Sequence, residues 1–208
     1  MIKLEYTDVC GFEPAIRGAR NPMNSWSRSD SKWQYNEFGT STFVIGENDH
    51  KLLLNLAKAG PDHGKYLRFI QCYVDITGPL YWYKELDTYR MGVEKNSCST
   101  MHKIQAKEFE IEDFSFNYLV AGWYDSLTLV IAMLNRARKK YLSSKNKIDW
   151  WQMIQLLPTS YNQRRTYVFS YAALRNIYHA RKNHKLDEWR DFCSWIETLP
   201  YAELITNE

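Results

Sequence analysis

Residues 67 to 76 alternate between apolar and polar side chains, and this pattern constrains the fold more than any other feature of the sequence. The alternation predicts a strand from Leu67 to Ile76 with one buried face. The apolar face would carry Ile70, Cys72, Val74 and Ile76. Gly78 and Pro79 come next, and a proline suits the first turn of a helix, which we expect to run to about Thr88.

The size and composition of the chain are those of a globular protein. It has 208 residues, 45% hydrophobic and 25% charged, which predicts one domain over residues 1–208. The net charge of only +3 gives little reason to expect a nucleic-acid or membrane surface. The four cysteines have no zinc spacing and the N-terminus is not a secretory signal, so we expect a cytoplasmic protein with reduced thiols.

Other segments show helical, strand or loop patterns. Weak alternation from Ile2 to Tyr6 is compatible with an edge strand. Two polar stretches, Asn21–Asn36 and Met91–Thr100, are predicted to be loops. The first of them is either a lid or binding segment, or a mobile surface loop. Helices are predicted over Pro14–Arg20, Asp49–Ala59, Trp123–Tyr141, Ile148–Leu157, Ser170–Lys182 and Leu186–Leu199.

The most apolar stretch of the chain runs from Tyr118 to Leu134. Asp125 interrupts it, and it is too short to span a membrane. The helix predicted there ends in a cluster of cations, which either complements the helix dipole or forms a binding patch. The cations are Arg136, Arg138, Lys139 and Lys140.

Arg181 is the first candidate functional residue. Leu174, Ile177, Tyr178 and Arg181 are spaced three, four and seven residues apart, so they share one face of the predicted helix. A guanidinium on an apolar face is costly unless it is paired or meets an anion. A buried ion pair, or a side chain that reaches solvent at the helix end, is the structural alternative.

Two further features are weaker candidates. Arg90 precedes a stretch rich in hydroxyl and amide groups, a combination that suits a phosphate; these groups belong to Asn96, Ser97, Ser99 and Thr100. His63 stands alone between a helix stop and the strand, and the other histidines form no metal pattern with it. There is no G-x-G-x-x-G, P-loop, G-x-S-x-G or H-E-x-x-H motif, which argues against classical dinucleotide binding and serine hydrolysis.

The order of these features along the chain, from His63 through the strand to the helix that carries Arg181, resembles that of the flavin-dependent thymidylate synthases. That family has G-H-E-x-P-x-E-H, a strand, A-P and Q-x-x-R-H-R, followed by S-x-N-x-x-S-x-R-Y. Here the match from His63 to Arg90 needs no gap, with Gly78-Pro79 in the A-P place and Arg90 on the last arginine of R-H-R. Asn96 to Ser99 then matches N-x-x-S after one extra residue.

The C-terminal part of the resemblance is also gapless. Leu157-Pro158 through Arg181 looks like the family's L-P…N-x-R-x-L-x-N-F-L-x-L-R, and Ala15 to Arg20 resembles its first helix. Several cations of the family are replaced, and Lys84, Lys95, Arg164 and Arg165 are candidates to compensate. The replacing residues are Thr88, Tyr89, Met101, Ile154 and Ala172, while Glu85 and Ser170 stand where the family has Gln and Asn.

The resemblance implies an α+β fold with a mostly antiparallel central sheet flanked by helices. It also implies a homotetramer with active sites between subunits, which methylates dUMP to dTMP with FAD, NADPH and methylenetetrahydrofolate. Arg181 would contact the uracil and act as the catalytic residue, favouring ionisation at N3. His63, Arg90, Ser170 and Asn176 would bind the flavin, and Glu85, Asn96, Ser97 and Ser99 would bind dUMP.

Two alternatives remain open from the sequence. The replaced R-H-R residues suggest a homologue that binds a pyrimidine nucleotide without catalysis or with altered specificity. The abundance of Trp and Tyr, together with the basic helix end, suggests a single-stranded nucleic-acid-binding protein.

Overall fold

The computed structural model describes residues 2–35 and 37–207. Its contacts group the chain into two compact units. Unit one contains residues 1–3, 75–88 and 96–166, and unit two contains residues 4–74, 89–95 and 167–208. The expectation of one domain over the whole chain stays a prediction.

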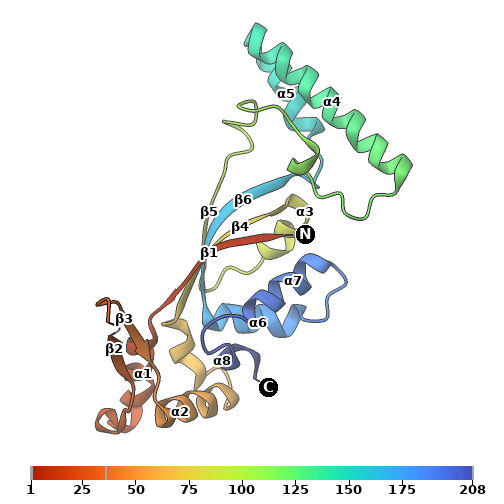
Figure 1. Cartoon of the computed structure of the whole chain (residues 1–208). Coiled ribbons are helices and arrows are strands. Elements are labelled where there is room, and N and C mark those ends of the chain that lie inside the picture. The colour runs from red at the N-terminus through yellow and green to blue at the C-terminus, as the bar shows by residue number, and fades with distance from the viewer. Residues whose placement is uncertain (1, 36, 208) are drawn as a thin grey trace. The chain divides into compact units, whose positions relative to one another are not determined.

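A four-stranded antiparallel sheet is formed by segments from both ends of the chain (Figure 1). Its strand order is β1-β4-β6-β5. The strands are β1 (Lys3–Cys10), β4 (Gln71–Pro79), β5 (Val93–Ser97) and β6 (Asn162–Ser170). Each of these strands has residues in both units. The α+β class with a mostly antiparallel sheet and flanking helices is confirmed.

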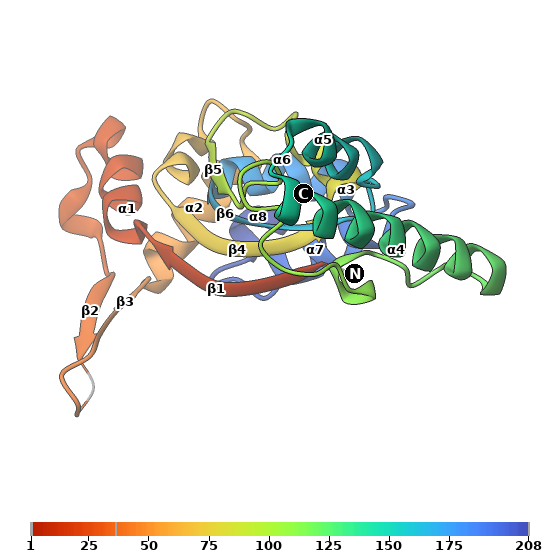
Figure 2. The same ribbon diagram turned by 90° about the horizontal axis from the view of Figure 1, so that it is seen from above.

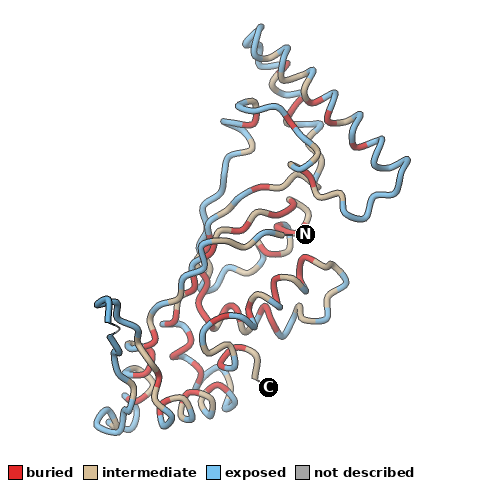
Figure 3. The backbone as a smooth tube through the Cα atoms, in the orientation of Figure 1, coloured by how far each residue is buried: buried red, intermediate tan, exposed pale blue. Residues whose placement is uncertain are grey.

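Unit one has an apolar core of its own. It contains α3 (Leu80–Leu86), the 3-10 helix η4 (Ile111–Asp113), α4 (Ala121–Ser144) and α5 (Lys147–Leu156). Helices α4 and α5 pack side by side, as Figures 1 and 2 show. Only one side of α4 is buried (Figure 3), because Leu127, Ile131 and Leu134 recur at helical spacing and pack with Met153 of α5.

Unit two contains the remaining elements. They are α1 (Phe12–Arg20), η1 (Asn21–Met23), η2 (Trp26–Arg28), β2 (Lys32–Tyr35), β3 (Ser41–Val44), α2 (Glu47–Lys58), η3 (Gly64–Arg68), α6 (Tyr171–Arg181), α7 (Asp187–Ile196) and α8 (Glu203–Thr206). Strands β2 and β3 pair antiparallel as a separate hairpin. None of the described helices is long and apolar enough to cross a lipid bilayer.

The C-terminal helices follow their sequence patterns closely. Leu174, Ile177 and Tyr178 are buried on α6, and Trp189, Phe192, Cys193 and Ile196 are buried on α7. Ser170 ends β6 and caps α6, because its Oγ accepts a hydrogen bond from the N–H of Ala173 at 3.2 Å. The helices predicted over Ser170–Lys182 and Leu186–Leu199 are therefore confirmed, with shorter bounds.

Several local predictions were wrong. The strand predicted from Leu67 begins at Gln71, because residues 64 to 68 form η3. The loop predicted over Met91–Thr100 contains β5, whose backbone pairs with β6 although its side chains do not alternate in burial. The basic cluster does not end its helix, because α4 continues to Ser144. Strand β6 was not predicted at all.

The polar stretch predicted as a loop over Asn21–Asn36 is anchored by Asp49. It contains η1, η2 and β2, and its last residue, Asn36, lies outside the described residues. Asp49 is fully buried and pairs with Arg20, with 2.6 Å between Oδ1 and Nη2. Its Oδ2 accepts hydrogen bonds from the hydroxyls of Ser29 and Ser31, each at 2.6 Å. These contacts fix residues 29 to 31 to α2.

Candidate functional site

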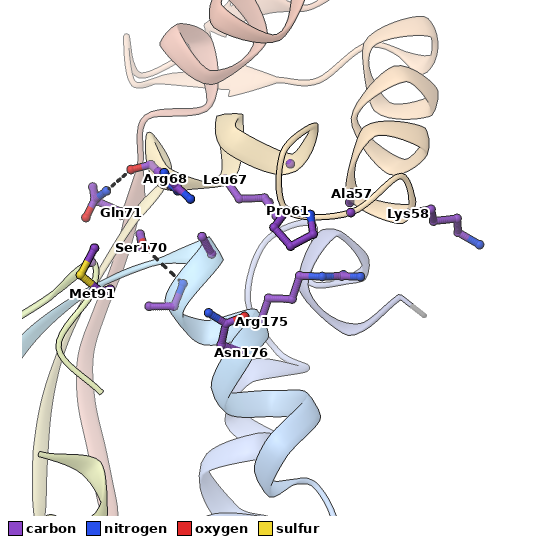
Figure 4. A pocket seen from close by; sticks show the side chains of 15 residues that line it. Ala57, Lys58, Pro61, Leu67, Arg68, Gln71, Met91, Ser170, Arg175 and Asn176 are labelled. Carbon is purple, nitrogen blue, oxygen red and sulfur yellow. Dashed lines mark hydrogen bonds between the residues drawn. The ribbon is translucent and has the colours of Figure 1, made fainter. Parts of the chain in front are cut away.

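Unit two contains a cavity of about 500 Å³, shown in Figure 4. The end of α2, helix η3, the start of β4, the segment before β5 and the first half of α6 all contribute to its wall. Its apolar lining includes Ala57, Pro61, Leu67, Met91, Ala172 and Ala173. Polar and charged side chains complete it: Lys58, Arg68, Gln71, Ser170, Arg175 and Asn176.

The backbone before β5 approaches the start of α6 very closely at Gly92. The N–H of Ser170 donates to the carbonyl oxygen of Gly92 at 2.8 Å. Gly92 has a φ of +71°, and a Cβ atom built there would lie 2.4 Å from Ser170 Oγ. Only glycine is compatible with both the backbone conformation and this approach. The wall of the cavity is therefore formed by backbone at this point.

Two of the four residues expected to bind flavin line this cavity together, namely Ser170 and Asn176 (Figure 4). His63 and Arg90 are exposed and do not line it, although the wall includes Gly64 beside His63 and Met91 beside Arg90. The structure therefore brings together two of the four residues that were expected to bind flavin. Whether any of these residues binds a flavin stays a prediction.

Arg181 lies at the end of α6 and does not line the cavity. Its Nε donates a hydrogen bond to the hydroxyl of Tyr89 at 3.0 Å. Its guanidinium carbon lies 4.9 Å from the ring centroid of Trp189 and 5.7 Å from that of Tyr89. Aromatic faces attract a guanidinium, so two rings hold Arg181 on the apolar stripe where the sequence placed it.

The residues expected to bind dUMP lie in unit one, apart from Arg181. Asn96 and Ser97 are exposed on β5, an edge strand of the sheet, and Glu85 is half-buried on α3. Ser99 Oγ accepts hydrogen bonds from the N–H groups of Met101 and His102, at 3.1 and 2.9 Å. This accepting role leaves the Ser99 hydroxyl proton available to an anion.

The two arginines expected to compensate for lost cations are paired with carboxylates. Arg165 Nη1 lies 2.9 Å from Asp87 Oδ1, and its guanidinium carbon lies 3.8 Å from the ring centroid of Tyr83. Arg164 pairs with Asp75, 2.5 Å from Nη2 to Oδ2. Hydrogen bonds from Thr166 and Arg164 hold the pKa of Asp75 below its ordinary value. An incoming phosphate would have to compete with these carboxylates.

Sequence reasoning missed the cations of the cavity itself. Lys58 ends α2, Arg68 ends η3 and Arg175 lies within α6. The sequence did contain one signal for Arg175. The resembling motif has an arginine at the position of Ala172, and Arg175 follows three residues later, so the two positions share one face of the helix. No group of three or more His, Cys, Asp or Glu that would suit a metal occurs in the described ranges.

Comparison with solved structures shows similarity over essentially the full chain. A flavin-dependent thymidylate synthase ThyX from Helicobacter pylori, complexed with FAD and dUMP, superposes with a TM-score of 0.69 at 18% identity; 99% of this chain and 98% of that chain are covered. A second structure of Thymidylate Synthase X from Helicobacter pylori, with FAD and dUMP, gives a TM-score of 0.72 at 16% identity, covering 100% and 98%.

By sequence alone, no protein-family model and no curated protein matches the chain. The similarity therefore lies in the arrangement of the elements, at identities too low to carry over an activity. This chain has the fold of the flavin-dependent thymidylate synthases, at 16–18% sequence identity to the two structures compared.

Proposed function

We propose that this protein binds FAD in the cavity of unit two and methylates dUMP to dTMP. In this reaction the methylene carbon of methylenetetrahydrofolate bonds to C5 of the uracil, both of its bonds to folate nitrogens break, and the C5 proton leaves. The two folate nitrogens each gain a proton, so one proton is taken up from solvent in addition to the one released from C5. NADPH supplies the hydride that completes the methyl group, so the products are dTMP, tetrahydrofolate and NADP⁺. FAD, when bound, carries that hydride.

The cavity is the observation that carries this proposal. It gathers Ser170 and Asn176, two residues matched to the flavin contacts of the resembling family, in a chain whose whole fold is similar to two FAD-containing structures. Its lining suits a dinucleotide, because apolar walls at Leu67, Pro61 and Met91 accept ring systems while cations offer partners to a pyrophosphate.

The proposed roles of the other residues follow from their chemistry. Arg181, which lies beside the rings of Tyr89 and Trp189, presents an oriented guanidinium that would stabilise the pyrimidine anion formed at N3. Ser97 and Ser99 would donate hydroxyl protons to the dUMP phosphate, and Asn96 and Glu85 would bind the same nucleotide. The active unit would be a homotetramer in which neighbouring subunits complete each site.

Two measurements on the purified protein test the proposal. The first is whether FAD co-purifies in stoichiometric amount, read from the visible absorbance of the protein. The second is release of tritium from dUMP labelled at C5, in the presence of NADPH and methylenetetrahydrofolate. We expect both for the wild type, and we expect Arg181→Met to retain the flavin but lose most of the tritium release. A protein that takes up neither FAD nor dUMP would rule the proposal out.

A second candidate is a pyrimidine-nucleotide-binding homologue without methyl transfer. The observation that favours it is the pairing of Arg165 with Asp87 and of Arg164 with Asp75, because these two arginines of β6 were the expected replacements for lost phosphate-binding cations. This candidate predicts nucleotide binding without tritium release. It also predicts no growth when the gene is placed in a strain that requires thymidine.

The basic cluster on α4 gives little support to the alternative of a single-stranded nucleic-acid-binding protein. Of the basic cluster on α4, Arg138 donates to the carbonyl oxygen of Gln105, Lys139 lies 3.6 Å from Glu108, and Lys140 lies 2.9 Å from Asp149. Cations that are already paired add little to the attraction of a phosphate backbone.

A further inference from the structure

The charges that line the cavity of unit two are all of one sign. Lys58, Arg68 and Arg175 contribute to its wall, and no aspartate or glutamate is among the described residues that line it (Figure 4). Cations that line a concave surface without carboxylates raise the local concentration of anions. The cavity is therefore suited to a ligand with more than one negative charge.

The three cations differ in where they lie on the helices that carry them. Lys58 and Arg68 end their helices, where a positive charge also complements the helix dipole. Arg175 lies in the middle of α6, so the helix gives no reason for its charge. Burial lowers the pKa of Arg175, which means that its position costs free energy while the side chain is charged.

The contacts of Arg175 satisfy one side of its guanidinium with neutral groups. Nη1 donates to the carbonyl oxygens of Leu204 and Ile205, at 3.3 and 3.1 Å, and to the side-chain oxygen of Asn207. No carboxylate of the described residues pairs with it. The C-terminal segment thus orients Arg175 at the cavity wall without neutralising it, and a guanidinium can bind an anion through its remaining N–H groups.

The position of Arg175 relative to Ala172 gives it a specific role. Both residues line the cavity from one face of α6. We propose that Arg175, together with Arg68 and Lys58, binds the pyrophosphate of the flavin dinucleotide in place of the arginine that the motif has at position 172. This inference rests on the proposed function, because it assigns the residues that hold the phosphate groups of the same cofactor.

The test compares two flavins that differ in their phosphates. FAD and riboflavin share the ring system, but riboflavin has no phosphate. Both are titrated against the wild type, Arg175→Met and Arg68→Met by quenching of flavin fluorescence, after bound flavin has been removed. Arg190→Met is the matched control, because Arg190 is an exposed cation of α7 in the same unit and does not line the cavity.

We expect Arg175→Met to weaken FAD binding about ten- to a hundred-fold, since a charge-assisted hydrogen bond contributes this much. Riboflavin binding should change less than about two-fold, which is the expectation for a cation that contacts only phosphate. Arg175→Lys should recover part of the loss, and Arg190→Met should bind both flavins like the wild type. Raising the salt concentration should weaken FAD binding more than riboflavin binding.

The outcomes separate this inference from the proposed function. Equal loss of both flavins in Arg175→Met and Arg68→Met, or unchanged FAD binding in both, would overturn the assignment while FAD binding by the wild type still supported the proposed function. A wild type that binds neither flavin would overturn the proposed function itself. Arg68 is exposed, so Arg68→Met keeps the test decisive if Arg175→Met unfolds through loss of its contacts with the C-terminal segment.

Discussion

Arg181 donates a hydrogen bond from Nε to the hydroxyl of Tyr89 at 3.0 Å, so two positions of the resembling motifs that are 92 residues apart in sequence are in contact. The motif has histidine where Tyr89 stands, and arginine where Arg181 stands. The retained arginine is therefore oriented by the residue that replaces its neighbour in the motif.

Tyr89→Phe tests this contact. The variant keeps the ring against the guanidinium but removes the hydrogen-bond acceptor, so we expect unfolding free energy to fall by about 1 kcal/mol. If Arg181 contacts the uracil, the affinity for dUMP should also fall by several-fold, measured by calorimetry. Tyr118→Phe is the control, because the side chain of Tyr118 is exposed. Unchanged stability and dUMP affinity would mean that the hydroxyl does not orient Arg181.

Arg181→Lys tests the need for a planar guanidinium. Lysine keeps the positive charge but has no planar group to lie against the rings of Tyr89 and Trp189 or to donate through a planar fork. We expect the rate of dTMP formation to fall about a hundred-fold, the scale of losing one fixed donor to a developing anion. FAD binding should not change, because Arg181 does not line the cavity. Arg190→Lys should retain the wild-type rate, and a similar loss in that control would contradict the assignment.

Asp49→Asn should be among the most destabilising single changes. It leaves Arg20, which is 5% exposed, without its carboxylate partner, and removal of one member of a buried pair costs about 3–5 kcal/mol. Unfolding by urea at pH 7 measures this loss. Asp62→Asn, at an exposed position, serves as the control and should unfold like the wild type.

The contribution of Asp49 should also depend on pH. Burial alone would raise its pKa, but hydrogen bonds from Ser29, Ser31 and Arg20 outweigh burial and lower the pKa below the ordinary value of 3.8. A lowered folded-state pKa stabilises the fold at pH values above the ordinary one, and this stabilisation is lost as the pH falls through the lowered value. The difference between wild type and Asp49→Asn should therefore be constant near neutrality and shrink below about pH 4. A difference that stays constant down to pH 2 would contradict this account.

The four cysteines should separate into two classes. Cys10 and Cys98 are exposed, whereas Cys72 and Cys193 are buried. Burial raises the pKa of the Cys72 thiol to about 12 and that of Cys193 to about 11, and only the thiolate is nucleophilic. Ellman's reagent at pH 8 should titrate two thiols quickly in the folded protein and all four in guanidinium. Cys10→Ser should remove one of the fast thiols.

Gly92→Ala should damage the cavity as well as the fold. The new Cβ would meet Ser170 Oγ at 2.4 Å, in addition to the cost of a positive φ. Gly39→Ala is a close control, because Gly39 has a φ of +76° but nothing lies within 4 Å of a Cβ there. We expect both variants to lose about 1–2 kcal/mol from backbone strain. Only Gly92→Ala should lose more than that, and only it should weaken FAD binding.

Patterns set by burial were predictable from the sequence, and patterns set by backbone pairing were not. The apolar spacing of Leu174, Ile177 and Tyr178 located α6, because a helix buries one stripe. Strand β5 was missed because it lies at an edge of the sheet, where its side chains are mostly exposed and no alternation is required. Exposed side chains do not need to alternate in polarity, so the sequence does not reveal the backbone hydrogen bonds of this strand to β6.

The candidate site divides in the same way. A motif match was enough to select Ser170, Asn176 and Arg181, since each stands at a matching position of the resembling family. Arg68 and Lys58 come from other elements, and only the folded chain brings them to the wall shared with Arg175. The contact of Arg181 with Tyr89 likewise joins segments 92 residues apart, which no local spacing reveals.

Ser170 is the last residue of β6, and its side chain both caps α6 and lines the cavity. Anyone who wishes to redesign the cavity for a larger or differently charged cofactor will find that this position cannot be varied independently. A replacement has to fit beside Gly92 and still accept the N–H of Ala173, which leaves few choices beyond threonine, asparagine or aspartate. Arg68 and Lys58, in contrast, lie at exposed helix ends, where new specificity can be introduced at little cost in stability.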